Sequence, residues 1–298
     1  MRIVILLLSI ASLPAAVLDV GGAPVTVEIA SGPIDVGQPA LLRWITRAAE
    51  AVTAYYGQFP LKTEHVRVLP VARENGVFDG TTWGMRGGFT RISVGQRTTQ
   101  TELDRDWMMT HEFVHLAFPD VADQHHWIEE GLATYVEPIA RAQAKQLSPD
   151  EVWADMIRSL HQGEPEAGDR GLDHTHTWGR TYWGGALFAF VADVKIRQQT
   201  SNRKGLQDAL QAILHQGGSI VSSWPIEKVW KTGDAATRCT VLTDLYAAWK
   251  DKPVKVDLDA MWRDLGVSLH GRDVVYDDHA PLAGVRKAIL SDSGQSRP

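Results

Sequence analysis

Two histidines four residues apart, with a glutamate directly after the first, form a pattern typical of a metal site. They are His111, Glu112 and His115, in the stretch MMTHEFVHLAF. On a helix, positions i and i+4 lie on one face, so both imidazoles can bind the same metal ion. Glu112 would lie beside the open coordination position, where it can take a proton from an activated water molecule. The pattern therefore predicts a zinc site with its own general base.

The residues around this pattern favour a buried helix. Apolar side chains occur where they can pack it into a core: Trp107, Met108, Phe113, Val114, Leu116 and Phe118. The two histidines and the glutamate would then form a buried polar stripe, which is costly without a ligand or hydrogen-bond partners. The alternative is a helix whose histidines are partly exposed and bind nothing.

The common zinc-site spacings do not supply a third protein ligand. Position 121 is valine where a histidine would follow, and position 134 is threonine where a glutamate would follow. The stretch WIEEGLATY (127–135) predicts a second helix, and it carries Glu129 and Glu130. Gly131 would let a neighbouring helix come close. Glu130 and Glu129 are thus the competing candidates, with Asp120 and Asp123 as further alternatives.

Four other histidines could take part in a metal or substrate site. His125 and His126 precede the second helix, where they are expected to cap it or to support the site from behind the ligands. His174 and His176, in DHTHTWGR, leave a second metal site open, with substrate contact or simple loop polarity as the alternatives.

Apolar periodicity predicts strands early in the chain and helices later. Strands are expected within 17–35, 65–74 and 83–95, the last interrupted by Gly87-Gly88, with one helix at 38–59. Further helices are expected at about 101–118, 124–146, 149–162, 178–199, 204–216, 226–232, 238–250 and 257–265. The last thirty residues are expected to form a short strand and a frayed tail.

These elements predict an α+β fold, with a small N-terminal β-sheet packed on a mainly helical body. The expected division is a signal peptide at 1–16, a β-rich subdomain with one helix at 17–100, and a helical zinc-binding subdomain at 101–298. The start of the chain, MRIVILLLSIASLPAA, has an early positive charge, an apolar run and small residues, as secretory signals have. The chain is therefore expected to be exported, to a bacterial periplasm or beyond; a buried N-terminal strand is the alternative.

Composition narrows the classes of partner and site. The 298 residues carry a net charge of -6, which argues against nucleic acid as a partner. After the signal region, no segment reaches the ~18 apolar residues that a membrane span needs. Cys239 is the single cysteine, so any metal must be held by histidine and carboxylate. No G-x-S-x-G motif occurs, which disfavours a serine mechanism.

Three short segments in this order resemble the gluzincin (peptidase MA-like) zinc metallopeptidases, especially the catalytic domains of the aminopeptidase-N and glycyl aminopeptidase families. The first is HEFVH, and the second, WIEEGLATY, is similar to the family segment W-x-x-E-G-x-A-x-Y. The third, GRTYWGGALFAFVADV (179–194), resembles the helix start Y-x-x-G-A. The resemblance covers roughly residues 80–215.

This resemblance implies a thermolysin-like fold and a Zn²⁺ ion held by His111, His115 and Glu130. It implies that Glu112 activates water and that the Tyr182 hydroxyl stabilises the oxyanion of the reaction. A buried aromatic residue without a catalytic role is the alternative for Tyr182.

The stretch GMRGGFTRISVG (84–95) lies where gluzincins carry an edge strand that binds substrate. The resemblance therefore assigns substrate binding to Gly87 and Gly88, through main-chain hydrogen bonds to an extended peptide. The acidic motif with which aminopeptidase-N enzymes hold a free amine is absent, so strict aminopeptidase activity is not implied. Arg86 or Arg91 could instead bind a carboxylate or carbonyl.

The expected function is an exported zinc metallopeptidase acting on peptides or proteins. The alternatives are an inactive zinc-binding secreted interaction protein and a zinc hydrolase with a non-peptide substrate.

Overall fold

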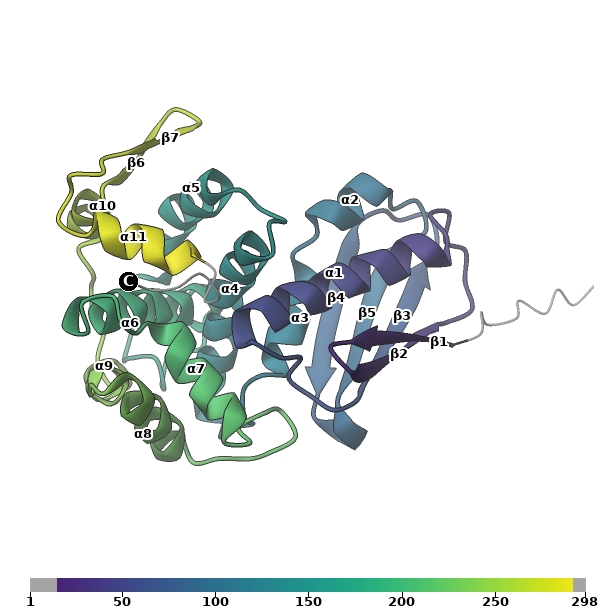
Figure 1. Cartoon of the computed structure of the whole chain (residues 1–298), viewed down its shortest axis with the longest axis horizontal. Coiled ribbons are helices and arrows are strands. Elements are labelled where there is room, and N and C mark those ends of the chain that lie inside the picture. Colours follow the sequence, from purple (N-terminus) through teal and green to yellow (C-terminus); the bar gives the residue numbers. More distant parts are fainter. Residues whose placement is uncertain (1–14, 292–298) are drawn as a thin grey trace, which may run out of the picture.

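A five-stranded sheet with one long helix occupies one half of the molecule, and a group of helices occupies the other half (Figure 1). The computed structural model describes residues 15–291. The predicted signal peptide, 1–16, falls almost entirely outside these residues. The α+β fold predicted from the sequence is confirmed.

The sheet has the strand order β1-β2-β3-β5-β4. Its strands are β1 (Ala16–Val20), β2 (Ala23–Ile29), β3 (Glu64–Val71), β4 (Val77–Trp83) and β5 (Phe89–Gly95). β2, β3 and β5 run parallel, while β1 and β4 are antiparallel to their neighbours. β4 is therefore an edge strand. The sequence prediction of one interrupted strand at 83–95 was wrong, because the chain turns back at Gly84–Gly88 and only 89–95 continue as β5.

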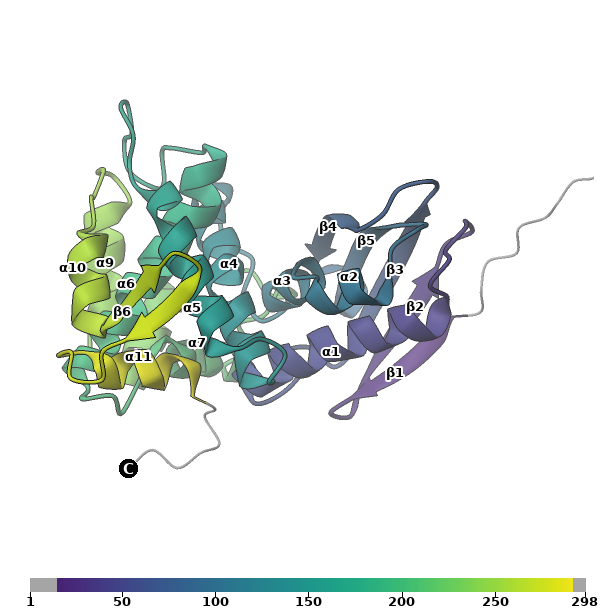
Figure 2. The ribbon, with the colours of Figure 1, turned by 90° about the horizontal axis from the view of Figure 1, so that it is seen from above.

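Helix α1 (Gln38–Tyr56) lies across one face of this sheet, as both ribbon views show (Figures 1 and 2). Its apolar residues recur every three or four positions, and Leu41, Ile45 and Val52 are fully buried. Alternate residues of the central strands are buried as well, such as Val66 and Val68. Helical and strand periodicity therefore bury matching apolar faces against each other.

The predicted helix at 101–118 is two helices, α2 (Gln100–Arg105) and α3 (Met108–His115). Asp106 separates them, because its carboxylate accepts hydrogen bonds from the Met109 backbone N–H at 3.0 Å and the Trp44 indole N–H at 2.9 Å. An aspartate that accepts from the first turn of a helix starts a new helix at that point.

The helical half follows the sequence prediction closely up to residue 265. Its helices are α4 (His126–Gln143), α5 (Pro149–Ser159), α6 (Gly185–Gln199), α7 (Leu206–His215), α8 (Ile226–Thr237), α9 (Val241–Trp249) and α10 (Leu258–Leu265). The expected short strand and frayed tail were wrong in part, because β6 (Val267–His270) and β7 (Asp273–Tyr276) form a hairpin and α11 (Ala283–Leu290) follows. Val285 and Ile289, four apart, bury the inner face of α11.

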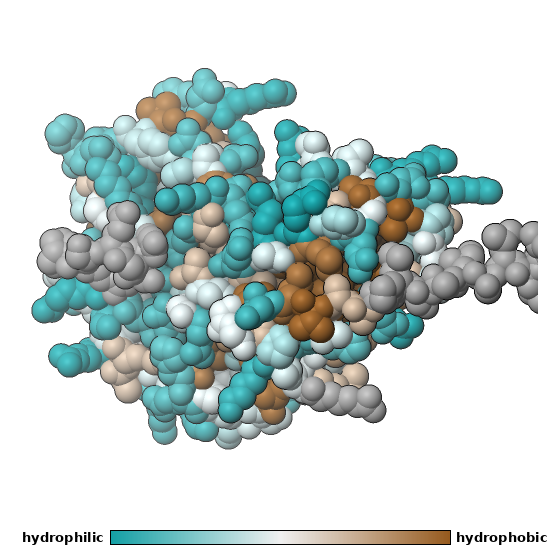
Figure 3. Space-filling view, turned by 45° about the vertical axis from the view of Figure 1, so that its right-hand side comes forward, coloured by the Kyte–Doolittle hydropathy of each residue, from teal (hydrophilic) through white to brown (hydrophobic). Residues whose placement is uncertain are grey.

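The surface that faces the viewer in Figure 3 is mostly hydrophilic, with a compact hydrophobic group near its middle. Among residues 15–291, no helix is both long enough and apolar enough to cross a bilayer.

Helices α4 and α6 cross at a pair of glycines. A Cβ atom on Gly131 would overlap the backbone of Gly185, and a Cβ on Gly185 would overlap the carbonyl oxygen of Trp127. The close approach predicted for Gly131 is thus confirmed. Because Gly131 follows Glu130 directly, this crossing also fixes where Glu130 lies relative to the start of α6.

We expect Gly131→Ala to destabilise the fold by about 1–3 kcal/mol, because the added methyl group overpacks a helix crossing that has no free space. The matched control is Gly284→Ala in α11, where an added Cβ meets only the Asn202 side chain at 3.4 Å. That substitution should leave stability unchanged or raise it, since alanine favours helix. Thermal and denaturant unfolding measure both. Equal effects of the two substitutions would contradict the packing explanation.

Candidate metal centre and catalytic cleft

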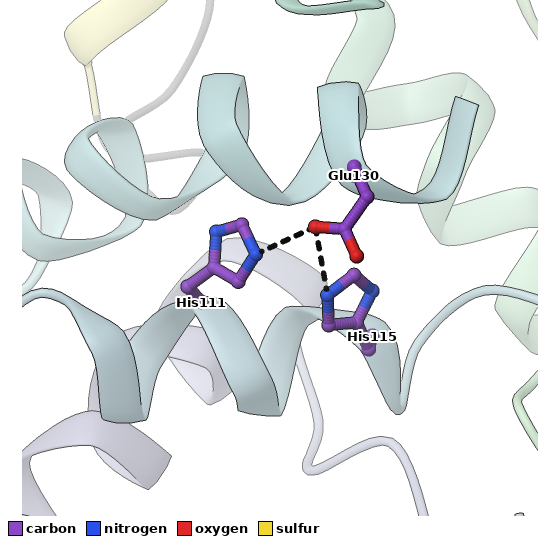
Figure 4. A group of neighbouring side chains, drawn as sticks. All are labelled: His111, His115 and Glu130. Atoms are coloured by element: carbon purple, nitrogen blue, oxygen red, sulfur yellow. Dashed lines mark hydrogen bonds and ion pairs between the residues drawn. The ribbon is translucent and has the colours of Figure 1, made fainter. Parts of the chain in front are cut away.

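Helices α3 and α4 bring three candidate metal ligands together. His111 and His115 project from α3 toward Glu130, which projects from α4 (Figure 4). His111 Nε2 lies 3.1 Å from Glu130 Oε2, and His115 Nε2 lies 3.6 Å from the same oxygen. One nitrogen or oxygen from each of the three residues lies within 4.8 Å of the others. The second helix therefore places its glutamate opposite the two histidines.

These atoms have the chemistry and spacing of a zinc site. Two imidazole nitrogens and one carboxylate oxygen are a common donor set for catalytic zinc, with bonds of about 2.0–2.2 Å. Two ligands of a tetrahedral ion at such distances lie about 3.4 Å apart. The measured separations of 3.1 and 3.6 Å between the histidine nitrogens and the Glu130 oxygen are close to that value.

The three side chains interact through hydrogen bonds and charge, which shift the pKa values of Glu130 and His115. Burial alone would raise the pKa of Glu130, but hydrogen bonds and charge from His111 and His115 hold it well below its usual range. Burial alone would lower the pKa of His115, but the hydrogen bond to Glu130 and its charge raise it to about 9. The cluster therefore keeps Glu130 ionised inside the protein, as a metal-binding carboxylate must be.

Glu112 points toward the edge of the sheet and meets β4. Its Oε2 atom accepts a hydrogen bond of 2.7 Å from the Thr82 hydroxyl. A Cβ on Gly80 would lie 2.6 Å from Glu112 Oε1, so a residue with a side chain there would displace the carboxylate. Sequence reasoning missed Thr82 and Gly80, because nothing local in VFDGTTW indicates that this strand would pair next to α3. Glu112 is 6 % exposed and lines the same cavity as the metal cluster.

Tyr182 lies on the opposite side, in a π-helical turn, η4 (Gly179–Gly184), that leads into α6. Its ring stacks on His111 with a centroid separation of 6.3 Å and on Trp178 with one of 5.9 Å. Burial, then the charges of Glu130 and Glu112, raise the pKa of the Tyr182 hydroxyl to about 12. The hydroxyl is therefore protonated at neutral pH and able to donate. Single π-helical turns are frequent at functional sites.

The site opens into two cavities of about 620 Å³ each. The first is bordered by β4, from Asp79 to Trp83, and contains the cluster together with Glu112 and Glu129. The second extends between α4 and α5. Its walls include the apolar side chains Trp107, Leu147, Val152, Met156, Leu160, Trp178 and Trp183. Both cavities are lined by His111 and Tyr182, so they meet at the metal cluster.

The other candidate ligands lie around this centre. Glu129 faces His126, whose Nδ1 lies 3.2 Å away, and the other His126 nitrogen lies 3.4 Å from Glu130 Oε1. Asp120 accepts a hydrogen bond from the Ser223 hydroxyl at 2.7 Å. His125, buried, pairs with Asp173 at 3.0 Å. Of these, only His126 contacts the Glu130 carboxylate; it does so at Oε1, the oxygen that does not face His111 and His115, and it lines the same cavity.

The residues predicted for a second metal and for substrate lie farther away. His174 pairs with Asp251 at 2.8 Å, and within residues 15–291 no second group of three metal-binding side chains includes it or His176. Gly87 and Gly88 lie in the turn between β4 and β5, outside the lining of the cleft. The segment that borders the cleft is β4 itself.

The arginine candidates add little to the cleft. Arg91 lies over the Trp83 ring, 5.3 Å from its centroid, outside the residues that line either cavity. The Arg86 side chain falls outside the described part of the structure.

No protein-family model matches the sequence, and no curated protein does. Solved structures do match it. An aminopeptidase N family protein from Idiomarina loihiensis is 13% identical, with a TM-score of 0.65 over 85% of this chain and 49% of that one. An M1 zinc metallopeptidase mutant from Deinococcus radiodurans is 16% identical, with a TM-score of 0.52 over 82% of this chain and 52% of that one.

The same Deinococcus radiodurans enzyme, in a mutant bound to a Tyr-Ser-Ala substrate, gives 17% identity and a TM-score of 0.50 over 83% of this chain and 52% of that one. The chain thus spans about half the length of the structures it matches. At such low identity the likeness shows a shared fold. For the fold, the resemblance to the catalytic domains of aminopeptidase-N-type zinc metallopeptidases is confirmed.

Proposed function

We propose that this chain is an exported zinc metallopeptidase that hydrolyses peptide bonds. The observation that carries the proposal is the convergence of five side chains from three elements on one cleft. They are His111, Glu112, His115, Glu130 and Tyr182, all of which line it. The fold shared with M1 zinc metallopeptidases supports the same reaction class. The export proposal is supported by the charge, apolar run and small residues at 1–16.

His111, His115 and Glu130 would hold the zinc ion through the three atoms that already face one another (Figure 4). Zinc in such a site polarises water and the substrate carbonyl, which makes attack at neutral pH feasible. His126, which contacts the other oxygen of the Glu130 carboxylate, would keep that carboxylate in its orientation.

Glu112 would act as the general base. Its carboxylate would take a proton from the attacking water and pass it to the leaving amine. Glu112 can do this because it lines the same cavity as the metal cluster. The Thr82 hydroxyl holds one carboxylate oxygen at 2.7 Å and leaves the other for the reaction. The Tyr182 hydroxyl, protonated at neutral pH, would donate a hydrogen bond to the oxyanion that develops on the substrate carbonyl.

Strand β4 is the structural reason for proposing a peptide substrate. Within residues 15–291 it is an edge strand, with main-chain groups that face no neighbouring strand on one side, and it borders the cleft from Asp79 to Trp83. An extended peptide can add to such an edge and lie across the zinc cluster. The second cavity, whose walls are mainly apolar but also include charged side chains such as Arg105 and Glu137, would then receive a bulky apolar side chain next to the scissile bond.

We expect the purified protein to bind one zinc ion, and Glu130→Gln to weaken zinc binding at least tenfold, because the charged ligand is lost. Glu129→Gln is the matched control. The Glu129 carboxylate faces His126 rather than the two ligand histidines, so this substitution should leave the zinc stoichiometry unchanged. Metal analysis after dialysis against a chelator measures both. Loss of zinc in the Glu129 variant with retention in the Glu130 variant would exchange the roles of the two residues.

Glu112→Gln should keep zinc and lose about 10²–10⁴-fold in kcat, because an amide cannot accept the proton of water.

Tyr182→Phe should also keep zinc and lose about 10²-fold in kcat with little change in KM, because the Tyr182 hydroxyl acts in the transition state. A peptide library analysed by mass spectrometry provides the substrate. Zinc binding without hydrolysis of any peptide would favour the interaction protein or the non-peptide hydrolase.

Peptides with a bulky apolar residue beside the scissile bond should be cleaved with kcat/KM at least about tenfold higher than peptides with glycine there. Leu147→Trp, which narrows the second cavity, should reduce that preference while leaving cleavage of the glycine peptide unchanged. Progress curves on paired peptides measure the ratio. A variant with the parent's ratio would show that the side chain binds elsewhere.

A further inference from the structure

A second glutamate, Glu64, is buried inside the sheet near the cleft and has no role in the reaction proposed above. It lies at the start of β3 and is 2 % exposed. One of its oxygens, Oε1, lies 2.9 Å from the Thr90 hydroxyl, and the other, Oε2, is buried without a hydrogen-bond partner. A buried carboxyl group with an unpaired oxygen is costly when ionised, so its surroundings need an explanation.

Glu64 is joined to the proposed base by two threonine hydroxyls. Thr90 Oγ1 lies 3.1 Å from Thr82 Oγ1, and the Thr82 hydroxyl lies 2.7 Å from Glu112 Oε2. The path runs from β3 across β5 to the edge strand β4 and then to helix α3. Sheet register explains it, because Thr82 is paired directly with Thr90, and Thr90 with Val66, two residues from Glu64 on the same face.

A count of protons shows that one of the two carboxyl groups must be protonated if all three contacts along this path are hydrogen bonds. Three oxygen–oxygen contacts connect the two glutamates, but the two threonines supply only one hydroxyl proton each. If both carboxyl groups are ionised, one contact has no proton. Burial favours Glu64 as the protonated group, because it is 2 % exposed whereas Glu112 is 6 % exposed and lines the cleft. If Glu64 holds a proton on Oε1, three protons serve three contacts, and each group donates toward Glu112. Glu64 then donates to Thr90, Thr90 to Thr82, and Thr82 to Glu112.

We propose that Glu64 is a positioning residue which, in its protonated form, orients the Thr90 and Thr82 hydroxyls so that Thr82 donates to the carboxylate of Glu112. The proposal rests on the assignment of Glu112 as general base. Its effect would be to fix the orientation of the Glu112 carboxylate before water attacks, with one oxygen occupied and the other free.

The surroundings of Glu64 favour its protonated form. Burial raises the pKa of Glu64 to about 8, although hydrogen bonds from Thr90 and the His65 backbone lower it in part. The groups that interact with its carboxyl are the Thr90 hydroxyl and the Thr90 and His65 backbones, none of them charged. His65, next on β3, points to the other face and lies near Glu28 at 3.7 Å.

Gly88 is part of this arrangement. A Cβ at Gly88 would overlap Glu64 Oε2, and its φ of +122° is unfavourable for other residues. The glycine therefore gives the carboxyl group room inside the sheet. This is a structural reason for a glycine at a position that the sequence resemblance assigns to substrate.

The first test breaks the path at Thr90, which is fully buried. Thr90→Val removes the hydroxyl but keeps the shape, and Thr90→Ser keeps the hydroxyl. We expect the valine variant to lose about tenfold in kcat with KM and zinc content unchanged, and the serine variant to stay within about twofold of the parent. Equal kcat values for the two folded variants would overturn the proposal.

The second test uses Glu64→Gln, whose amide donates to Thr90 at every pH. The parent should lose kcat as pH rises through about 8, where Glu64 ionises and stops donating. The glutamine variant should equal the parent at pH 6 and keep that kcat above pH 8. A falling limb at the same pH in both proteins would show that Glu64 does not orient the base.

The third test needs no catalysis. With ¹³C-labelled glutamate, the Glu64 carboxyl signal is assigned by its absence in Glu64→Gln and titrated in the zinc-loaded protein. In Glu112→Gln the amide can donate back along the path, so the Glu64 midpoint should fall by about one pH unit. When Glu112→Gln is added to Thr90→Val, the Glu64 midpoint should stay at its value in Thr90→Val alone, because the path is already broken.

The titration separates failure of this proposal from failure of the proposed function. The shift in Glu112→Gln and its loss in the double variant support the path even if no peptide is hydrolysed. An unchanged Glu64 midpoint in Glu112→Gln would overturn the path even in an active peptidase.

Discussion

The charge of Glu130, buried between two helices, is the constraint on which the site depends. A buried carboxylate is costly unless hydrogen bonds, positive charge or a metal ion compensate it. His111 and His115 contact the Glu130 carboxylate directly, and all three side chains can bind the same metal ion. The surrounding helices fix that geometry. Asp106 sets where α3 begins, and the glycine crossing of α4 and α6 sets where Glu130 and Tyr182 face each other.

The sheet half and the helical half contribute different parts of the same cleft. The helices carry the candidate ligands and Tyr182, whereas the sheet contributes the edge strand β4 and the hydroxyl that holds Glu112. Because that hydroxyl belongs to a strand paired through β5 to β3, the interior of the sheet is connected to Glu112, the proposed base. Under the proposed mechanism, residues far from the His111, His115 and Glu130 cluster would influence the reaction through hydrogen bonds rather than through direct contact.

The local patterns in the sequence were sufficient for most helices and for the two histidines, whereas the choice of Glu130 over Glu129 came from the family resemblance. The spacing of His111 and His115 alone places them on one helical face, and Gly131 predicted a close helix crossing. The edge strand expected at 84–95 was misplaced: residues 89–95 form the internal strand β5, and β4 is the edge. Which strand lies at the edge depends on pairing between distant residues. Thr82, Thr90 and Glu64 were missed for the same reason. Helix α11 was missed because its burial depends on packing against other helices.

A crystal structure of the zinc-loaded protein, with diffraction recorded on both sides of the zinc absorption edge, tests the central claim most directly. The account predicts one anomalous peak about 2.0–2.2 Å from His111 Nε2, His115 Nε2 and a carboxylate oxygen of Glu130. A zinc ion bound elsewhere, or one bound to the two histidines with Glu130 turned away, would contradict it.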